Sequence, residues 1–184
     1  MKELSLNVLD IAENSVKAKA TLTEILIDEN ETVLTITIRD NGCGMKPETV
    51  LAAQNPFYTT RTTRSVGMGI PLFMMQAEQT GGKLTLSSKH FEEHPDDHGT
   101  VISASFIKNH LDYTPLGDIV SSITTLIQGH PDTDFLFSHK NGEKEVALDT
   151  RELREVLGEV PLNSYEVIKW VTEFLQEQYS ENQE

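Results

Sequence analysis

The segment that most constrains the fold is a strand pattern that ends in a carboxylate. Leu34, Ile36 and Ile38 alternate with polar residues, as in a β-strand with one apolar and one polar face. Asp40 continues the apolar phase, whereas its neighbour Arg39 belongs to the polar face. A carboxylate on the core side of a sheet is costly unless another group pairs with it, so the rest of the chain has to supply that partner.

A glycine-containing turn follows this strand, with the sequence Asp-Asn-Gly-Cys-Gly-Met over residues 40–45. Gly42 and Gly44 let the backbone approach a ligand closely. A buried acceptor beside such a turn suits a flat heterocycle with an exocyclic amino group, such as adenine. Short Asp-Asn-Gly segments also form β-turns in which the aspartate bonds its own backbone, so both interpretations remain open.

Composition limits the classes of partner. The chain has 184 residues, of which 38% are hydrophobic, and this suits one globular domain or one domain with an appendage. Its 29 Asp and Glu against 15 Lys and Arg give a net charge of -14, which argues against binding to nucleic acid or to an anionic membrane. One cysteine excludes an internal disulfide, and the absence of a leader or a long apolar run favours a cytoplasmic location.

Periodicity predicts a helix followed by a set of strands. Leu6, Leu9, Ala12 and Val16 recur at helical spacing within residues 6–19. Strands are predicted over residues 21–28, 32–40, 83–88 and 100–107, with a short helix over 47–53.

The polar face of the first helix carries Asp10, Glu13, Asn14 and Lys17 at positions i, i+3, i+4 and i+7. Asp10 and Asn14 therefore lie side by side, one turn apart. Such a stripe is often only the wet side of a helix. An amide oxygen and a carboxylate in this arrangement also suit a Mg²⁺-bound phosphate, with Asn14 binding the metal and Asp10 orienting water.

A second polar residue is expected to point into the core. Thr100, Ile102, Ala104 and Phe106 share the apolar face of their strand, so the Thr100 hydroxyl points inward as Asp40 does. Two inward polar groups on central strands suggest one shared polar site.

A loop over residues 55–69 combines cations with glycines. Arg61 and Arg64 are two of the chain's few basic residues, and the threonines around them disfavour a helix. Gly67 and Gly69 lead directly into an apolar helix, whose free N-terminal amides favour an anion. Together these features predict a phosphate-binding loop.

The segment between the last two of these strands contains His90, His94 and His98 among acidic residues. Their spacing matches no standard zinc pattern, and Pro95 prevents a helix that would align the rings. A solvated loop is therefore favoured over a metal site.

After His110 the pattern changes to a small α/β arrangement without a catalytic constellation. Helices are predicted over residues 115–128, 150–157 and 164–178, and a Lys-Asn-Gly turn predicts a hairpin of strands over 134–139 and 145–149. His130 and His139 lack partners at a recognisable spacing, so both are predicted to lie on the surface.

Several segments resemble, in order, the motifs of the GHKL ATPases, the class of histidine kinases, DNA gyrase, heat-shock chaperones and MutL-type mismatch-repair proteins. Residues 9–21 resemble the N box, 40–45 the adenine-reading G1 box, 56–61 the F box of histidine kinases, 67–70 the second glycine box and 99–100 the last box. The histidine kinase-like ATPase domain is the most similar, with MutL-like features in the N box. The resemblance covers residues 1–108 and none of the rest.

This resemblance implies an α/β fold, the two-layer Bergerat sandwich, in which helices cover one face of a mixed sheet. We therefore expect a histidine kinase-like ATP-binding domain over residues 1–108 and a small α/β appendage of unknown role over 109–184. The implied cofactors are ATP and Mg²⁺.

The resemblance also implies roles for individual residues. Asp40 would accept from the adenine amino group with support from Thr100, and Asn14 would bind Mg²⁺. The implied cofactor-binding residues are Asn14, Lys17, Asp40, Gly42, Gly44, Met45, Phe57, Thr60, Arg61, Gly67, Met68, Gly69, Ile70 and Thr100. Asp10 would be the catalytic residue. The family usually has a glutamate at this position, which is one methylene longer. The shorter side chain of Asp10 would affect the rate of ATP hydrolysis more than the binding of ATP.

Three functions are compatible with these residues. Because the chain begins at the N box, we expect no helical hairpin with a phosphorylated histidine, and the first function is a kinase or ATPase that acts in trans on a partner protein. The second is an ATP-dependent conformational switch or binding module with little turnover. The third, a MutL-like or chaperone-like clamp, needs a dimerising transducer domain, for which the segment after His110 is too small and too acidic. A homodimer remains open.

Overall fold

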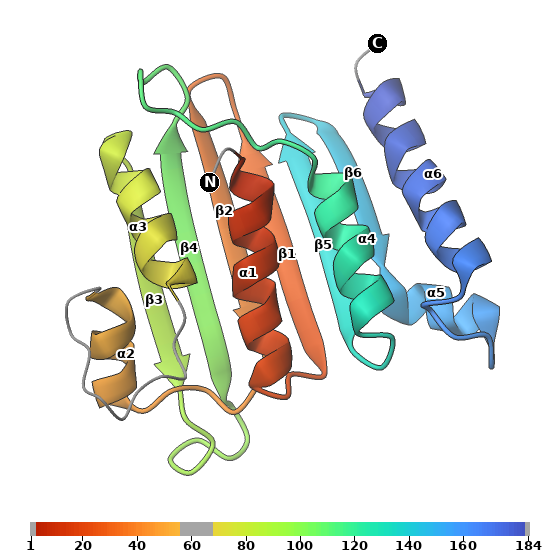
Figure 1. Ribbon diagram of the computed structural model, residues 1–184, viewed down its shortest axis with the longest axis horizontal. Coiled ribbons are helices and arrows are strands. Elements are labelled where there is room, and N and C mark those ends of the chain that lie inside the picture. The colour runs from red at the N-terminus through yellow and green to blue at the C-terminus, as the bar shows by residue number, and fades with distance from the viewer. Residues whose placement is uncertain (1–2, 56–67, 183–184) are drawn as a thin grey trace.

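The computed structural model describes residues 3–55 and 68–182, and within them six strands form one mixed sheet (Figure 1). The strand order is β3-β4-β2-β1-β5-β6. β1 and β5 are parallel, and the other neighbouring strands are antiparallel. The strands are β1 (Leu22–Glu29), β2 (Val33–Asp40), β3 (Lys83–Lys89), β4 (Gly99–Ile107), β5 (Asp134–Asn141) and β6 (Lys144–Asp149).

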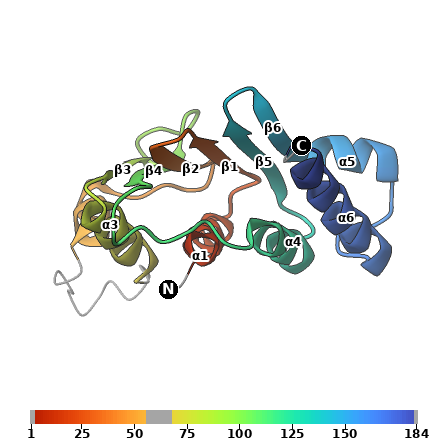
Figure 2. The ribbon, with the colours of Figure 1, turned by 90° about the horizontal axis from the view of Figure 1, so that it is seen from above.

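Helices cover one face of this sheet. Figures 1 and 2 show α1, α3 and α4 in a layer on the same side of the strands, with α1 between the other two. The helices of the described residues are α1 (Leu4–Lys17), α2 (Pro47–Gln54), α3 (Gly69–Gln79), α4 (Ile119–Gly129), α5 (Thr150–Leu157) and α6 (Tyr165–Glu181). This arrangement confirms the predicted two-layer α/β sandwich. None of these helices has the length and apolar character needed to cross a bilayer.

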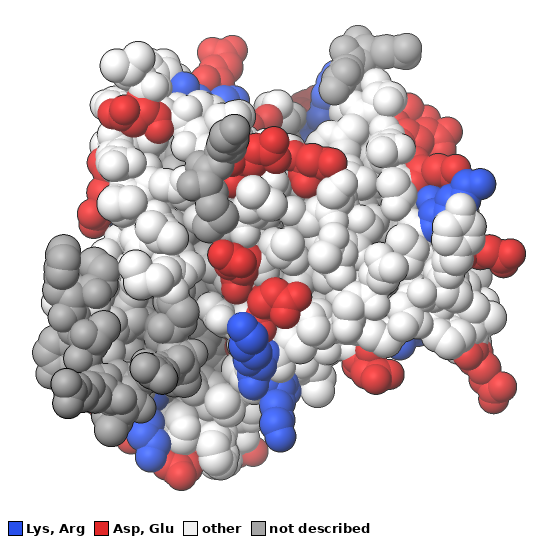
Figure 3. Space-filling model, viewed as in Figure 1, with Lys and Arg blue, Asp and Glu red and all other residues white. Residues whose placement is uncertain are grey.

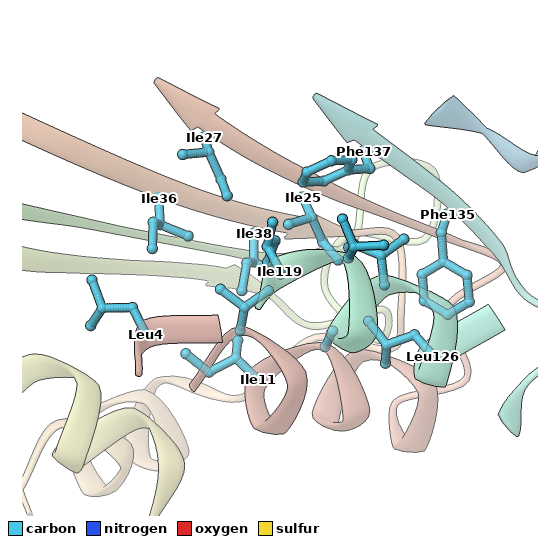
Figure 4. Close-up of a cluster of buried hydrophobic side chains, with 14 of the residues drawn as sticks. Leu4, Ile11, Ile25, Ile27, Ile36, Ile38, Ile119, Leu126, Phe135 and Phe137 are labelled. Carbon is cyan, nitrogen blue, oxygen red and sulfur yellow. The ribbon is translucent and has the colours of Figure 1, made fainter. Parts of the chain in front are cut away.

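The core lies between the sheet and the helical layer, as Figure 4 shows. Ile25 and Ile27 of β1 and Ile36 and Ile38 of β2 are buried on the same face of the sheet. They point toward apolar side chains of α1 and α4. The alternation in the sequence therefore predicted correctly which side of β2 is buried.

α1 begins two residues earlier than predicted, and its buried face differs from the predicted stripe. Leu4, Val8 and Ile11 are buried, whereas Leu6 is 43% exposed. The prediction for Leu6 was wrong because Leu4, outside the predicted helix, starts the stripe that recurs at i+4 and i+7. Ser15 continues this buried stripe, which brings a hydroxyl to the sheet.

The sheet and the core both continue across the predicted boundary at residue 108. β5 pairs with β1, from Leu22 and Asp134 at one end to Glu29 and Asn141 at the other. α4 lies against α1, and the buried apolar side chains form one cluster with members from both segments. The division into an ATP-binding domain and an appendage stays a prediction.

α6 closes the edge of the sheet at β6 through its side chains. The amide of Gln178 accepts from the N–H of Ala147 and donates to its carbonyl oxygen, both at 3.1 Å. Nδ2 of Asn182, one turn later, donates to the carbonyl oxygen of Glu145 at 3.2 Å. These bonds satisfy backbone groups that an edge strand leaves unpaired, so α6 is held along β6.

His139 is buried, and the prediction of a surface position was wrong. His139 is 9% exposed, and its Nδ1 lies 2.7 Å from the hydroxyl of Tyr179 on α6. Its Nε2 lies 3.7 Å from the carboxylate of Glu29. Burial lowers the pKa of His139, and the negative charge of Glu29 opposes this effect. His130 is partly exposed and lies 2.9 Å from the carboxylate of Glu13.

The lowered pKa of His139 predicts that stability falls in acid. The ring titrates near pH 6.5 in the unfolded chain, so below about pH 6.5 the unfolded state takes up a proton that the folded state resists. The contribution of the neutral ring is therefore complete above that pH and is lost as the pH falls toward the folded-state pKa. We expect the free energy of unfolding in urea to decrease from about pH 7.5 to about pH 5.5, and His139→Gln to reduce this slope. The exposed His94→Gln is the control, and an unchanged slope in H139Q would contradict the prediction.

A chain that ends at Lys108 tests the predicted domain boundary. It would lack β5 and α4, so the edge of β1 and the side of α1 that α4 covers would meet solvent. We expect its Tm to fall by at least about 10 °C, because each kcal/mol lost shifts the Tm of a domain of this size by several degrees. A shortened chain as stable as the full chain in a thermal melt would show instead that the two segments fold independently.

Candidate functional site

Residues predicted from the sequence to bind a cofactor meet at a cavity of about 380 Å³ beside α1. The predicted residues that line it are Asn14, Lys17, Asp40, Gly44, Met45, Ile70 and Thr100. Ile11, Ile38 and Ile102 contribute apolar surface from α1, β2 and β4. The cavity therefore combines apolar walls with a few polar groups, as small-molecule sites do.

A second hollow, of about 420 Å³, lies on the other face of the sheet. Its lining includes Glu24, Arg39 and Lys89, and it shares Asp40 and Thr100 with the cavity beside α1. The cavity beside α1 has four isoleucines in its lining, and apolar walls of this kind suit a flat heterocycle. We therefore place the candidate site in the cavity beside α1.

Asp40 faces this cavity from the end of β2, and both oxygens of its carboxylate are fixed. Oγ of Ser15 on α1 donates to Oδ2 at 2.7 Å, and the N–H of Gly42 donates to Oδ1 at 2.9 Å. The second bond is the aspartate turn that the sequence left open as an alternative, so the turn and the cavity-facing carboxylate coexist. An ionised carboxylate has about four acceptor positions, so capacity remains for a donor in the cavity.

Thr100 lies beside Asp40 because β4 pairs with β2 at this position. Its side chain is buried, and its hydroxyl lies 2.8 Å from Oγ of Ser88 on β3. The same Ser88 oxygen accepts from the N–H of Met45 at 2.8 Å. The two inward polar side chains thus share one site, and Ser88 connects it to the loop that follows β2.

Gly42 and Gly44 allow this loop to pack against the rest of the protein. Gly44 has a φ of +69°, and a Cβ there would lie 1.9 Å from the carbonyl oxygen of Lys89. A Cβ on Gly42 would lie 2.8 Å from the Cβ of Ala18. The glycines are therefore needed to fit the turn between the end of α1 and the end of β3, whether or not a ligand approaches them.

Asp10 and Gly69 lie where α1 passes the N-terminus of α3. A Cβ on Gly69 would lie 3.5 Å from the Cβ of Asp10. Ile70, in the first turn of α3, is buried and lines the cavity, whereas Met68 is 59% exposed and does not. Asp10 is exposed and does not line the cavity. It lies next to the N-terminal amides of α3, which have no partner within that helix.

Positive charge gathers at the C-terminal end of α1, next to the cavity. Lys17 lines the cavity and is exposed, and Lys19 follows it in the loop. Figure 3 shows basic side chains over this end of the helix. In a chain with a net charge of -14, such local cations favour an anionic ligand.

Four predicted residues, Phe57, Thr60, Arg61 and Gly67, lie outside the described residues. Within residues 3–55 and 68–182, no group of three or more His, Cys, Asp and Glu side chains is arranged to hold a metal ion. Mg²⁺ usually takes one or two protein oxygens and completes its shell with phosphate and water, so a single Asn14 oxygen beside the cavity fits such an ion. Its role as a ligand stays a prediction.

Sequence reasoning missed Ser15 and Ser88, the two hydroxyls that hold Asp40 and Thr100. Ser15 has the helical spacing of the buried stripe of α1, and this was a usable signal once the stripe was placed correctly. Ser88 meets Thr100 through the register of β3 against β4. Strand register depends on the whole sheet, so no local pattern indicated this contact.

Comparison with known proteins places this geometry in context. The C4-dicarboxylate transport sensor protein DctB of Pseudomonas aeruginosa is 30% identical over 69 residues, which are 37% of this chain and 11% of that protein. The N-terminal domain of a DNA repair protein superposes with a TM-score of 0.57 at 17% identity, covering 81% of this chain and 53% of that chain. The Aquifex aeolicus MutL ATPase domain complexed with ADP gives a TM-score of 0.53 at 18% identity, with 85% and 69% covered. These two structures show that the fold is shared.

A family-level comparison extends over the whole site. The family of histidine kinase-, DNA gyrase B- and HSP90-like ATPases matches residues 2–125. This span contains every residue that lines the cavity beside α1 and continues into α4. The match covers more than half of this chain, and the chain therefore belongs to the histidine kinase-, DNA gyrase B- and HSP90-like ATPase family.

Proposed function

We propose that this chain binds ATP with the adenine ring in the cavity beside α1. The family and the ADP complex of the MutL neighbour support this ligand. The observation that carries the proposal is the Asp40 carboxylate, which faces an apolar cavity while Ser15 and Gly42 fix its oxygens. Adenine presents an amino donor to such an acceptor, whereas guanine presents a carbonyl group at the same place.

The phosphates would extend from the cavity toward the N-terminus of α3. Free amides at a helix N-terminus favour anions, and Lys17 adds a positive charge beside the cavity. Asn14 would hold the Mg²⁺ that accompanies the phosphates, and it lines the cavity one turn before the end of α1. Phe57, Thr60, Arg61 and Gly67 would contribute from the preceding loop, on the strength of the sequence resemblance alone.

Action in trans on a partner protein, as a kinase or ATPase, is the second part of the proposal. The similarity to the sensor protein DctB, over 69 residues that are 11% of that protein, supports this part of the proposal. Asp10 would orient the attacking water, since it lies beside the first amides of α3 where the phosphates are expected.

The alternative is an ATP-dependent switch with little turnover. One observation favours it: Asp10 lies outside the cavity lining and has a shorter side chain than the glutamate usual at this position. A carboxylate beside a helix N-terminus is also stabilised by the helix dipole, so Asp10 has a structural role available to it. The rate of ATP hydrolysis distinguishes the two functions.

Asp40→Asn tests the nucleotide site. The amide replaces an acceptor oxygen by a donor that opposes the adenine amino group, so we expect ATP binding to weaken by about 2–3 kcal/mol, the scale of a hydrogen bond to a charged group. Isothermal titration calorimetry with ATP and GTP measures this, and the wild-type chain is expected to prefer ATP. Asp28→Asn, an exposed change of the same charge on β1, is the matched control. Equal affinities for ATP and GTP would contradict the proposal. Equal affinities for ATP with and without Mg²⁺ would contradict the role of Asn14 as a metal ligand.

Asp10 variants decide between the enzyme and the switch. If Asp10 orients water, Asp10→Ala should lower ATP hydrolysis by about 10²-fold, while Asp10→Glu should restore the usual reach and raise the rate above that of wild type. ATP affinity should change little in either variant. Phosphate release at saturating ATP measures the rate, with Asp96→Ala in the exposed loop as the control. If all four chains hydrolyse ATP equally slowly, the switch is the better assignment.

A further inference from the structure

An apolar groove of about 350 Å³ lies between β6, α5 and α6, at the opposite end of the sheet from β3. Figures 1 and 2 show α5 at this end of the sheet, next to the end of α6 at which that helix begins. The apolar residues that line it are Leu136, Leu148, Leu153, Val156, Trp170 and Phe174. None of them lines the cavity beside α1. We call this feature the C-terminal groove.

The C-terminal groove exposes large apolar side chains. Val156 is 84% exposed and Trp170 is 48% exposed. The Trp170 ring stacks on Phe174, with the ring centroids 4.7 Å apart and an interplanar angle of 12°. Of the ten large apolar side chains exposed in the described residues, four lie between Val156 and Trp170 in the sequence, and the two at the ends of this range line the groove. Such a concentration is typical of an interaction surface, whereas single exposed apolar residues are not.

Hydrogen bonds hold the walls of the groove in place without a partner. Gln178 and Asn182 fix α6 along β6. The hydroxyl of Thr150, at the start of α5, donates to the carboxylate of Asp134 at 2.9 Å. Arg154, one turn later, pairs with the same carboxylate at 2.7 Å. A groove with fixed walls binds a partner without the cost of ordering them.

The same hydrogen bonds determine which kind of backbone fits. A partner that binds as an added strand needs free N–H and C=O groups on a sheet edge. At β6 the backbone N–H and C=O of Ala147 and the C=O of Glu145 are already hydrogen-bonded to side chains of α6 and of the residue that follows it. This leaves side-chain packing as the available mode, and a helix in a groove is the mode that depends on side chains.

Two acidic residues line the groove, and the segment that forms its two helices has a net negative charge. Asp149 and Glu152 are part of the lining. Between residues 150 and 181 the sequence has seven Glu against three Lys and Arg. The three cations are engaged in ion pairs of Arg151 with Asp149, Arg154 with Asp134, and Lys169 with Glu173. The remaining negative charge attracts a basic segment, and it repels an anionic membrane and a second copy of this chain, whose net charge is -14.

We propose that the C-terminal groove binds a basic amphipathic helix of a partner protein. Apolar side chains at i, i+3, i+4 and i+7 of that helix would pack on Trp170, Phe174 and Val156. Lysine or arginine side chains beside this stripe would face Glu152, within the field of the net negative charge of residues 150–181. The proposal does not depend on nucleotide binding.

The single tryptophan of the chain makes the groove directly observable, because Trp170 lies in its wall. The probe is a helical peptide of about 14 residues with Leu at i, i+3, i+4 and i+7 and Lys elsewhere. Titrated into the full chain, it should give a saturable blue shift of tryptophan fluorescence. A peptide with Glu in place of Lys should give none at the same concentrations. Equal binding of both peptides, or no saturable change with either, would overturn the proposal.

Two charge-matched variants locate the binding. Val156→Arg places a bulky cation in the groove. It should lower the affinity for the Lys peptide at least about tenfold, as loss of an interface anchor does. Leu111→Arg makes the same charge change at a side chain that is 96% exposed and outside the groove, and should leave the affinity within about twofold. Both positions are exposed, so circular dichroism should show unchanged melting. Equal affinity of the two variants would overturn the proposal, as would a tryptophan shift induced by phosphatidylserine vesicles or a dimer that Val156→Arg disrupts.

Discussion

A carboxylate at the core side of β2 needs hydrogen-bond donors, and the fold around it is arranged so that they reach it. Ser15 comes from α1 and Gly42 from the loop after β2, so Asp40 fixes both the helix and the loop relative to the sheet. The two donors occupy part of the acceptor capacity and leave the rest facing the cavity. The same side chain that organises this end of the fold therefore keeps acceptor capacity inside a cavity with apolar walls.

Local periodicity predicted the parts of the structure that depend on neighbouring residues. The alternation around Asp40 and Thr100 placed both side chains inward, and the register of β2 against β4 makes them neighbours. The start of α4 could not be found in the same way. The sequence predicted it near residue 115, but Gly117 has a φ of +75°, and Asp118 caps the helix by accepting from the N–H of Ser121 at 3.0 Å.

Residue-type expectations failed where they overrode this periodicity. His139 alternates with Phe135 and Phe137, so the pattern of period two already indicated an inward ring. The expectation that an unpartnered histidine lies on the surface was applied instead. Its partners, Tyr179 on α6 and Glu29 on β1, are far apart in the sequence and could not have been seen from it. The same limit concealed Ser88, whose contact with Thr100 is set by strand register.

The parallel pairing of β1 with β5 has a consequence for the order in which the protein is made. β1 ends at residue 29, yet its second neighbour begins at residue 134, so a ribosome has to synthesise all the residues between them before that neighbour exists. Until then the growing polypeptide carries an uncovered strand beside a helix whose α4-facing side is bare, and such surfaces attract other nascent chains. The large separation along the chain also slows closure of the sheet. The synthesis of β5 therefore determines when the free edge of β1 is covered and protected from aggregation.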